Sequence, residues 1–316
     1  MYDIIGDIHG YAGALRRLLA ELGYEEREGA WRHAERTAIF LGDFVDRGTG
    51  IPEVLRIVRS MVESGSALAV MGNHEFNAVA YRRERVAGSG EYLREHSEKN
   101  REQHEATLEQ LSEAELEEAL LWFQTLPMWL ELPGLRIVHA CWDPHSLAVV
   151  REQHDRCGGF TDEFFRAACV EGAELFEAVE VLLKGKELEL PDGVSFLDKG
   201  GHERRAVRVK WFEDPGRAGG TYRGHAFYFR PQDLERIPDA ALATDAVRAA
   251  RPYGVDEPPI FIGHFWMPHD LTPEPLASNV ACLDYSVARD GRLCAYRWEG
   301  EAVLRREAFV SVPAAE

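Results

Sequence analysis

The chain has 316 residues and a formal net charge of −18 at pH 7, and 45% of its residues are hydrophobic. This composition predicts a globular protein with a substantial core, and the excess of carboxylates argues against binding to nucleic acid. No apolar run approaches the roughly 18 residues that span a bilayer, and no basic segment followed by an apolar one opens the chain. We therefore expect a cytoplasmic protein without a membrane partner.

Strand and helix signals alternate through the first third of the chain. Short apolar runs predict three strands, at 2–6, 37–42 and 67–72. Amphipathic repeats predict a helix after each of the first two strands, at 11–23 and 51–65. Strands that alternate with helices indicate βαβ units and a largely parallel sheet.

The rest of the chain is less regular. Residues 82–118 are charge-dense and helical in character, and an amphipathic repeat predicts one helix over 164–183. The stretches VSFLD (194–198) and AVRVKWF (206–212) flank a Gly-containing turn at 199–201, and together they predict a hairpin. Further apolar runs predict five more strands, at 128–132, 135–140, 258–264, 279–285 and 292–298.

Polar side chains follow five of the predicted strands at their carboxyl ends. In chain order they are Asp7 and His9, then Asp43, Asp46 and Arg47, then Asn73, His74 and Glu75, and finally His139 and His264. Open α/β sheets bind their ligands at this edge, so we expect these groups to converge on one site. A glycine precedes each of the first three groups, where the chain must turn sharply and approach a ligand closely.

The donors at these strand ends suit divalent metal ions. The set of candidate ligands is Asp7, His9, Asp43, Asn73, His139 and His264. Carboxylate, amide and imidazole donors without thiolates favour Mn²⁺ or Fe²⁺, with Zn²⁺ as an alternative. Six donors exceed what one catalytic ion with an open position can use, whereas two ions about 3.5–4 Å apart with a bridging carboxylate would use them all. Such ions would also reverse the field that the acidic chain sets against a phosphorylated substrate.

Three motifs carry a resemblance to a known family. GDIHG (6–10), GDFVDRG (42–48) and GNHE (72–75) resemble the calcineurin-like metallophosphoesterases, in particular their phosphoprotein phosphatase branch. Within that branch the chain is more similar to prokaryotic members of the diadenosine tetraphosphatase and serine/threonine phosphatase type. The resemblance implies a four-layer α/β/β/α sandwich with two mixed central sheets. It also implies one domain over 1–316, with an insertion or lid at about 143–258.

The resemblance also implies a division of the ligands between two metals. Asp7, His9 and His264 would hold one ion, Asn73 and His139 would hold the other, and Asp43 would bridge them.

Catalytic roles follow in the same way. His74 would protonate the leaving oxygen, Asp46 would orient the His74 imidazole, and Arg47 would grip phosphate oxygens through its planar fork. A metal-bridging hydroxide would attack phosphorus in line.

We expect a metal-dependent phosphatase that hydrolyses phosphoester or phosphoanhydride bonds, with Mn²⁺ as the first choice of metal. Its substrate would be a phosphoprotein (Ser, Thr or Tyr) or a dinucleoside polyphosphate. The alternative is a catalytically weak phosphoesterase-fold scaffold that binds protein partners. A nuclease of the wider superfamily is disfavoured, because Asp46 and Arg47 belong to the phosphomonoester-type pattern.

A second phosphate-binding residue is not defined by a motif. Arg208 and Lys210 alternate along VRVKW and therefore share one face of a strand, which would point either into the site or into solvent. Glu75 would either support the metal site or be an acid favoured by the helix dipole.

Several other groups are interpreted more simply. The charge run at 82–105 predicts a solvated helical face or a lid. His202 and His225 flank the hairpin region and could touch substrate. The remaining histidines lie in polar stretches and are expected at the surface, at His33, His96, His104, His145, His154 and His269.

Overall fold

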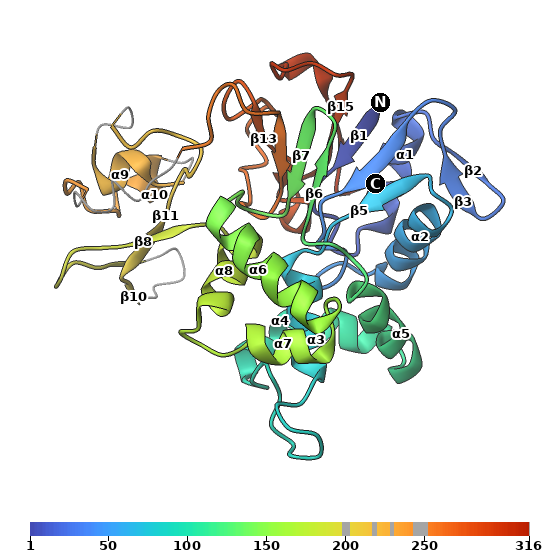
Figure 1. The fold of residues 1–316 in the computed structure, drawn as a ribbon. Coiled ribbons are helices and arrows are strands. Elements are labelled where there is room, and N and C mark those ends of the chain that lie inside the picture. The colour runs from blue at the N-terminus through green and yellow to red at the C-terminus, as the bar shows by residue number, and fades with distance from the viewer. Residues whose placement is uncertain (198–202, 217–219, 228–230, 243–251, 316) are drawn as a thin grey trace.

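The computed structural model describes residues 1–197, 203–216, 220–227, 231–242 and 252–315 (Figure 1). The predicted turn at 199–201 and His202 lie outside the described residues.

The first sheet is mixed and has six strands in the order β14-β15-β1-β4-β5, with β16 beside β15. β1, β4 and β5 are parallel to one another, whereas β15 runs antiparallel to β1. Their register places Ile5 opposite Phe40 and Phe40 opposite Ala69, so the three strands end level with one another. The strands are β1 (Tyr2–Ile5), β4 (Thr37–Phe40), β5 (Ala67–Ala69), β14 (Asp284–Tyr285), β15 (Arg292–Trp298) and β16 (Phe309–Pro313).

The second sheet is also mixed, with the order β13-β12-β7-β6. β12 is parallel to both β13 and β7, and β6 is antiparallel to β7. The strands are β6 (Trp129–Leu132), β7 (Leu135–Val138), β12 (Ile260–Ile262) and β13 (Val280–Cys282). The predicted α/β class with two mixed sheets is confirmed.

Helices flank the two sheets. α1 (Ala12–Glu21) lies against β15 and β16, and α2 (Ile51–Glu63) lies against β5. The helices that follow the third strand are α3 (Asn73–Arg82), α4 (Glu98–Gln110) and α5 (Glu113–Phe123). The helices that follow β7 are α6 (Pro144–Cys157), α7 (Asp162–Ala168) and α8 (Glu174–Lys184). The short pieces are β2 (Glu25–Arg27), β3 (Ala30–Arg32), η1 (Val287–Arg289) and η2 (Arg306–Ala308).

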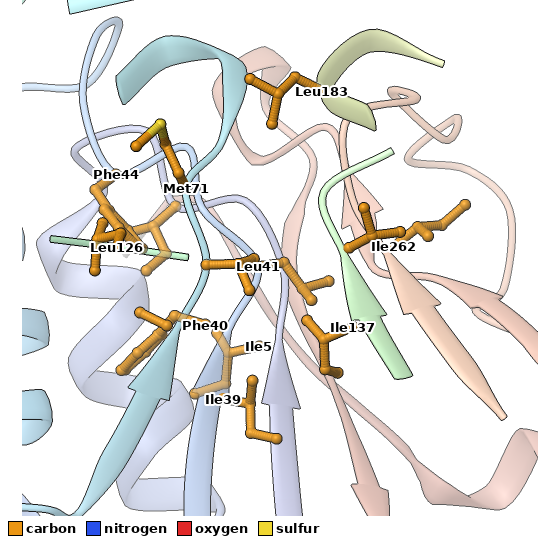
Figure 2. Close-up of a cluster of buried hydrophobic side chains, with 14 of the residues drawn as sticks. Ile5, Ile39, Phe40, Leu41, Phe44, Met71, Leu126, Ile137, Leu183 and Ile262 are labelled. Carbon is orange, nitrogen blue, oxygen red and sulfur yellow. The ribbon is translucent and has the colours of Figure 1, made fainter. Parts of the chain in front are cut away.

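One large apolar core joins the sheets and these helices. Figure 2 shows part of it, where Ile5 and Ile39 of the first sheet and Ile137 and Ile262 of the second belong to one cluster. All four side chains are fully buried. Burial of such side chains stabilises the fold by about 1.5–3 kcal/mol each and fixes the two sheets relative to each other.

Two helix predictions need correction. Residues 82–118 are not continuously helical, because the chain leaves α3 after Arg82 and forms a β-bridge between Glu84 and Tyr92 before α4 begins. The single helix predicted over 164–183 is broken into α7 and α8. Gly172 has a φ of +75°, which a continuing helix does not allow.

The stretch expected as an insertion, 143–258, divides into two parts. α6, α7 and α8 pack into the large core through residues such as Val150, Phe164 and Leu182. The described residues of 187–242, here called the arm, have a small core of their own, built from Leu190, Phe196, Val207, Val209, Tyr222, Ala226, Ile237 and Leu242. Figure 1 shows the arm projecting to one side of the two sheets.

The arm contains short elements only. It holds β8 (Glu187–Glu189), β9 (Phe196–Leu197), β10 (Glu203–Arg204), β11 (Ala206–Arg208), α9 (Tyr222–His225) and α10 (Pro231–Leu234). β9 pairs with β10, whereas β11, which lies in the expected second hairpin strand at 206–212, pairs with β8 instead of β9, so that predicted pairing is wrong. No helix in the described part of the chain combines the length and apolar character needed to cross a membrane.

Candidate metal centre and active site

The two sheets bring the predicted strand-end residues together. GDIHG, GDFVDRG and GNHE follow β1, β4 and β5, which are neighbours in the first sheet, and His139 and His264 follow β7 and β12, which are neighbours in the second. All six candidate metal ligands, together with Asp46 and His74, are buried. The predicted convergence of polar side chains at the carboxyl ends of the strands therefore includes strands of both sheets.

The backbone at this edge is strained. Left-handed φ angles, which few non-glycine residues adopt, occur at His9 (47°), Asp43 (54°), Asp46 (67°), Arg47 (73°) and His264 (68°). Such conformations cost about 1–3 kcal/mol each and persist where the surrounding structure imposes them, typically at functional sites.

Two glycines are required by close approach. A Cβ on Gly72 would lie 2.3 Å from Asp43 Oδ1, and a Cβ on Gly263 would lie 2.0 Å from Asp7 Oδ1. The glycine of GNHE and the glycine before His264 thus make room for carboxylates of other strands.

Asp43 lies at the centre of the cluster. Its Oδ2 is 3.6 Å from His9 Nε2 and its Oδ1 is 3.4 Å from His139 Nε2, so the two carboxylate oxygens face different histidines. Donor atoms of His9, Asp43 and His74 lie within 4.8 Å of one another, and so do those of Asp43, His139 and His264. This is the arrangement that a bridging carboxylate requires.

The grouping of His264 differs from the one implied by the resemblance. Asn73 Oδ1 lies 2.7 Å from His264 Nδ1 and 3.1 Å from His139 Nε2. His264 therefore groups with Asn73, His139 and Asp43, whereas His9 lies on the other side of Asp43. The reason is topological, since His264 and His139 end adjacent strands of the second sheet.

Hydrogen bonds fix the orientation of two ligand imidazoles. His9 Nδ1 lies 3.1 Å from the carbonyl oxygen of Val45, and His139 Nδ1 lies 2.7 Å from that of Leu41. A carbonyl can only accept, so each Nδ1 donates, and Nε2 is the ring atom that each histidine directs toward the cluster. Metal-binding histidines are commonly held in this way.

Unsatisfied polar atoms and surplus charge indicate that the site fits metal ions. Asp7 Oδ1 and His9 Nε2 are buried without a hydrogen-bond partner among the described residues. Burial and then the neighbouring Asp284 raise the pKa of Asp7 well above its usual value. Bound cations would satisfy these atoms and relieve the repulsion between buried carboxylates.

The histidines on the two sides of Asp43 differ in protonation. Burial, followed by repulsion from His74, lowers the pKa of His9 to about 3. Burial also opposes the charged form of His139, but the adjacent Asp43 carboxylate raises its pKa to about 10. His139 must therefore give up a proton to bind a metal, which makes metal binding pH-dependent.

Asp46 and His74 form a tight pair beside the cluster. His74 Nδ1 lies 2.5 Å from Asp46 Oδ2, while its Nε2 faces Asp43 Oδ2 at 3.9 Å. Burial opposes the imidazolium form, yet Asp43 and Asp46 raise the pKa of His74 above its usual value. The ring is thus held by one nitrogen and presents the other to the centre of the site.

Glu75 is buried and holds the Asp43 loop. Its Oε2 accepts the backbone N–H groups of Asp43 (2.7 Å) and Gly72 (2.9 Å), and its Oε1 accepts that of Phe44 (2.7 Å). Of the two interpretations left open by the sequence, these contacts favour support of the site, because the carboxylate ties GDFVDRG to GNHE.

His104 was expected at the surface, and this prediction is wrong. The side chain is buried, and its Nδ1 lies 2.7 Å from Asp46 Oδ1. Thr107, also on α4, donates its hydroxyl to the same oxygen at 2.5 Å. Both lie in the charge-dense segment interpreted as a solvated face or lid, and no local pattern distinguishes them from its exposed residues.

Asp284 is a second residue that the sequence interpretation missed. It is buried beyond β13, and its carboxylate accepts the backbone N–H groups of Trp266 (2.7 Å) and Ser286 (3.0 Å). Burial raises its pKa. The signal used for the other strand ends, a polar residue after an apolar run, was present here in CLDY.

The predicted phosphate-binding residues lie in different surroundings. Arg47 is exposed and its guanidinium lies over the indole of Trp266, 4.4 Å from the ring centroid. Arg208 and Lys210 are half-buried on the face of the arm opposite the buried Val207 and Val209, as their alternation predicts.

The charge of Arg208 acts on His264. Next to burial, it is the main cause of the lowered pKa of His264. Arg208 and Lys210 each have an acidic neighbour at 3.6 Å, which is Glu187 for Arg208 and Glu213 for Lys210.

The other histidines are variously placed. His145 and His269 are exposed, as predicted, while His33, His96 and His154 are half-buried. His96 stacks on Tyr81 and Tyr92. His225 is buried in the arm, so contact between its side chain and substrate is not supported.

Two mixed sheets with buried imidazole, carboxylate and amide groups gathered at their carboxyl ends define a metallophosphoesterase. The chain belongs to the calcineurin-like phosphoesterase family, whose model matches residues 2–264. The family predicted from the three motifs is thereby confirmed.

Curated relatives cover different shares of the chain. An asymmetrical bis(5'-nucleosyl)-tetraphosphatase PrpE from Halalkalibacterium halodurans is 45% identical over 74 residues, which are 23% of this chain and 30% of the relative. The first relatives matched are thus spanned over less than a third of their length. A symmetrical bis(5'-nucleosyl)-tetraphosphatase from Aromatoleum aromaticum is 27% identical over 234 residues, 68% of this chain and 77% of the relative.

Solved structures that the chain matches include two phosphatases. A cold-active protein-tyrosine phosphatase of Shewanella has a TM-score of 0.48 and 15% identity, covering 99% of this chain and 80% of its own. A serine/threonine phosphatase from Saccharomyces cerevisiae has a TM-score of 0.45 and 14% identity, covering 99% and 78%.

Proposed function

We propose that this protein is a dinuclear metal-dependent phosphatase that hydrolyses phosphoester or phosphoanhydride bonds. The substrate would be a dinucleoside polyphosphate or a phosphoprotein. The observation that carries the proposal is the position of Asp43, whose two carboxylate oxygens face His9 and His139, beside the Asp46–His74 pair.

The metal ligands in this proposal are those at the strand ends. Asp7, His9 and Asp43 would hold one ion, and Asp43, Asn73, His139 and His264 the other. The donor set favours Mn²⁺, with Fe²⁺ or Zn²⁺ as alternatives. Metal ions bound there supply Lewis-acid polarisation of a phosphoryl oxygen and acidify water at neutral pH.

The chain's own residues would handle the phosphate and the proton. Arg47 would bind non-bridging phosphate oxygens through its guanidinium. Water adds to phosphorus and loses one proton to solvent while the bond from phosphorus to the leaving oxygen breaks, and His74 gives its proton to that oxygen from Nε2. Asp46 holds the ring through Nδ1 so that Nε2 faces the reacting phosphate. A positioned acid of this kind contributes about 10²–10⁴-fold to the rate.

The proposal is tested by assaying purified protein with Mn²⁺, Fe²⁺ or Zn²⁺. The substrates are p-nitrophenyl phosphate, phosphoserine and phosphotyrosine peptides, diadenosine tetraphosphate and a phosphodiester. We expect metal-dependent hydrolysis of at least one phosphomonoester or phosphoanhydride, and a large loss in His74→Ala. Activity that persists after metal removal or in His74→Ala would contradict the mechanism. No activity on any substrate would favour a scaffold that binds protein partners.

A further inference from the structure

Two arginines converge on one indole at the edge of the metal cluster. The guanidinium carbons of Arg47 and Arg289 lie 4.4 Å and 4.2 Å from the ring centroid of Trp266. The Trp266 ring is itself 6.1 Å from the ring of His9. Arg289 comes from η1, more than 200 residues away from Arg47 along the chain, so the convergence is produced by the fold.

The convergence is imposed by a buried carboxylate. Asp284 accepts the N–H groups of Trp266 and Ser286 on its two oxygens, which joins the loop after β12 to the segment that carries Arg289. Trp266 and Ser286 both have left-handed φ angles, of 53° and 57°. Residues without glycine's freedom keep such conformations only where their surroundings impose them.

The two arginines lack direct ion pairs with described residues, although the carboxylates of Asp43, Asp46 and Asp284 attract the Arg47 cation from a distance and act to raise its pKa. Neither guanidinium forms an ion pair with a residue in the described part of the chain, although the chain has 54 acidic residues. Two cations that share one aromatic ring repel each other, and an anion bound between them would turn this cost into attraction. Stacking on the indole also orients the two planar forks, which suits bidentate binding of phosphate oxygens.

We propose that Arg289 and Trp266, together with Arg47, form a subsite for an anionic group next to the phosphate that is hydrolysed. The ligand class is a polyphosphate chain, whose next phosphate would bind beside the Trp266 ring, within reach of both guanidinium groups. The inference rests on the proposed function, and it assigns Arg289 and Trp266 to substrate selection. A phosphomonoester carries no second phosphate and would use the subsite less.

The test compares Arg289→Ala with wild type on diadenosine tetraphosphate and on p-nitrophenyl phosphate. Loss of one charge-assisted contact is expected to raise KM for the tetraphosphate about tenfold while changing kcat little, and to raise KM for p-nitrophenyl phosphate much less. Arg289→Lys, which keeps the charge, should recover part of the loss. Arg306→Ala, an exposed arginine in η2, is the charge-matched control.

A calorimetric measurement separates this inference from the proposed function. Inorganic tripolyphosphate should bind wild-type protein at least tenfold more tightly than Arg289→Ala, while binding of orthophosphate should differ less. An equal change for both anions, or no change, would overturn the subsite even if the enzyme is active. Selective loss of tripolyphosphate binding in a protein that hydrolyses nothing would support the anion site and overturn the proposed function alone.

A different observation supports a second inference, about α4. Asp46 uses both carboxylate oxygens, Oδ2 for His74 and Oδ1 for His104 and Thr107. The backbone N–H of Asp46 also donates to Thr107 Oγ1, at 3.0 Å. These contacts fix the carboxylate plane, and the carboxylate fixes the His74 ring.

We infer that His104 is a positioning residue that acts through Asp46 on the proton donor His74. Removing its contact leaves Asp46 free to rotate, so that His74 Nε2 is less well aimed at the leaving oxygen. Misplacement of a proton donor affects most the substrates whose leaving oxygen is strongly basic, because these need the proton earliest.

The test exploits this dependence on the leaving group. His104→Ala should lower kcat about tenfold for phenyl phosphate and much less for p-nitrophenyl phosphate, whose leaving group needs little protonation. His104→Gln, which keeps a donor, should recover part of the rate, and His96→Ala is the control for loss of a nearby histidine. An equal fall for both substrates would indicate a structural role and overturn the inference.

Discussion

The cluster of proposed metal ligands around Asp43, here called the cluster, and the arm differ in how firmly the structure holds their polar groups. At the cluster, ligands and neighbours are buried and connected, as in the bonds from Glu75 to three backbone amides of the Asp43 and Asn73 loops. In the arm, Arg208 and Lys210 sit half-exposed on short strands over a small separate core. The fixed geometry suits bond-breaking chemistry, and the looser geometry suits selection among substrates.

The two regions meet at defined points. Trp211 of the arm donates its indole N–H to the carbonyl of Ala140, the residue after His139, at 3.1 Å. Phe227 of the arm packs against Phe265, the residue after His264, with ring centroids 4.1 Å apart. The arm is therefore anchored beside His139 and His264, the two proposed metal ligands of the second sheet.

The largest effect is expected from Asp43→Asn. Weakening the bridging carboxylate should lower kcat/KM by about three orders of magnitude, since several kcal/mol of transition-state stabilisation depends on the metals. The amount of bound metal and kcat/KM should fall together. Asp155→Asn, at an exposed position of α6, is the matched control, and an active Asp43→Asn protein would remove the distinction between cluster and arm.

His74→Asn should come next. We expect kcat to fall by about 10²–10⁴-fold while metal content stays at the wild-type value, because His74 moves a proton and is not proposed as a ligand. Metal analysis beside steady-state kinetics checks this. Loss of metal in His74→Asn would show that the ring is part of the metal site.

Glu75→Gln tests whether the cluster depends on its buried support. The amide cannot accept from three N–H groups as the carboxylate does, so the Asp43 loop should loosen and metal affinity should fall about 10–100-fold. Titration with Mn²⁺ measures the change. Glu115→Gln, which alters the exposed capping acid of α5, should leave metal affinity unchanged.

Substitutions in the arm should have smaller effects on catalysis. Arg208→Ala is expected to raise KM several-fold and Lys210→Ala less, since the charge of Arg208 is near enough to His264 to lower the pKa of that imidazole. Steady-state kinetics at several salt concentrations would measure both. If neither substitution changes KM measurably, the face of the arm that carries Arg208 and Lys210 is a solvent-exposed face without a role in substrate binding.

The smallest effect on activity, but a distinct one on stability, concerns His225. Burial and then Lys210 lower its pKa to about 4, from a usual value of 6.5. Neutral His225 therefore contributes stability above pH 6.5, and that contribution is lost as the pH falls from 6.5 toward 4. Hydrogen exchange of β11 should be faster at pH 5 than at pH 7 after correction for intrinsic rates. His225→Gln should abolish this difference, and its persistence would point to another group.

Much of the site could be predicted from local sequence. A short apolar run followed by glycine and polar residues specifies a strand, a tight turn and side chains at the sheet edge, so Asp7, Asp43 and Asn73 were placed by pattern alone. The same rule extended to Asp284 would have found it as well. The helix break at Gly172 was missed because the apolar repeat continues across it.

Which site residues contact one another was decided by the tertiary structure alone. Strand order within the second sheet placed His264 with Asn73 and His139, and packing of α4 against the GDFVDRG loop brought His104 to Asp46. The meeting of Arg289 with Arg47 over Trp266 likewise joins segments far apart in the chain. Local patterns determine which residues reach a sheet edge, because backbone periodicity and turn sterics act within a few residues. Which of them touch depends on how whole elements pack, and that is fixed by the shared core.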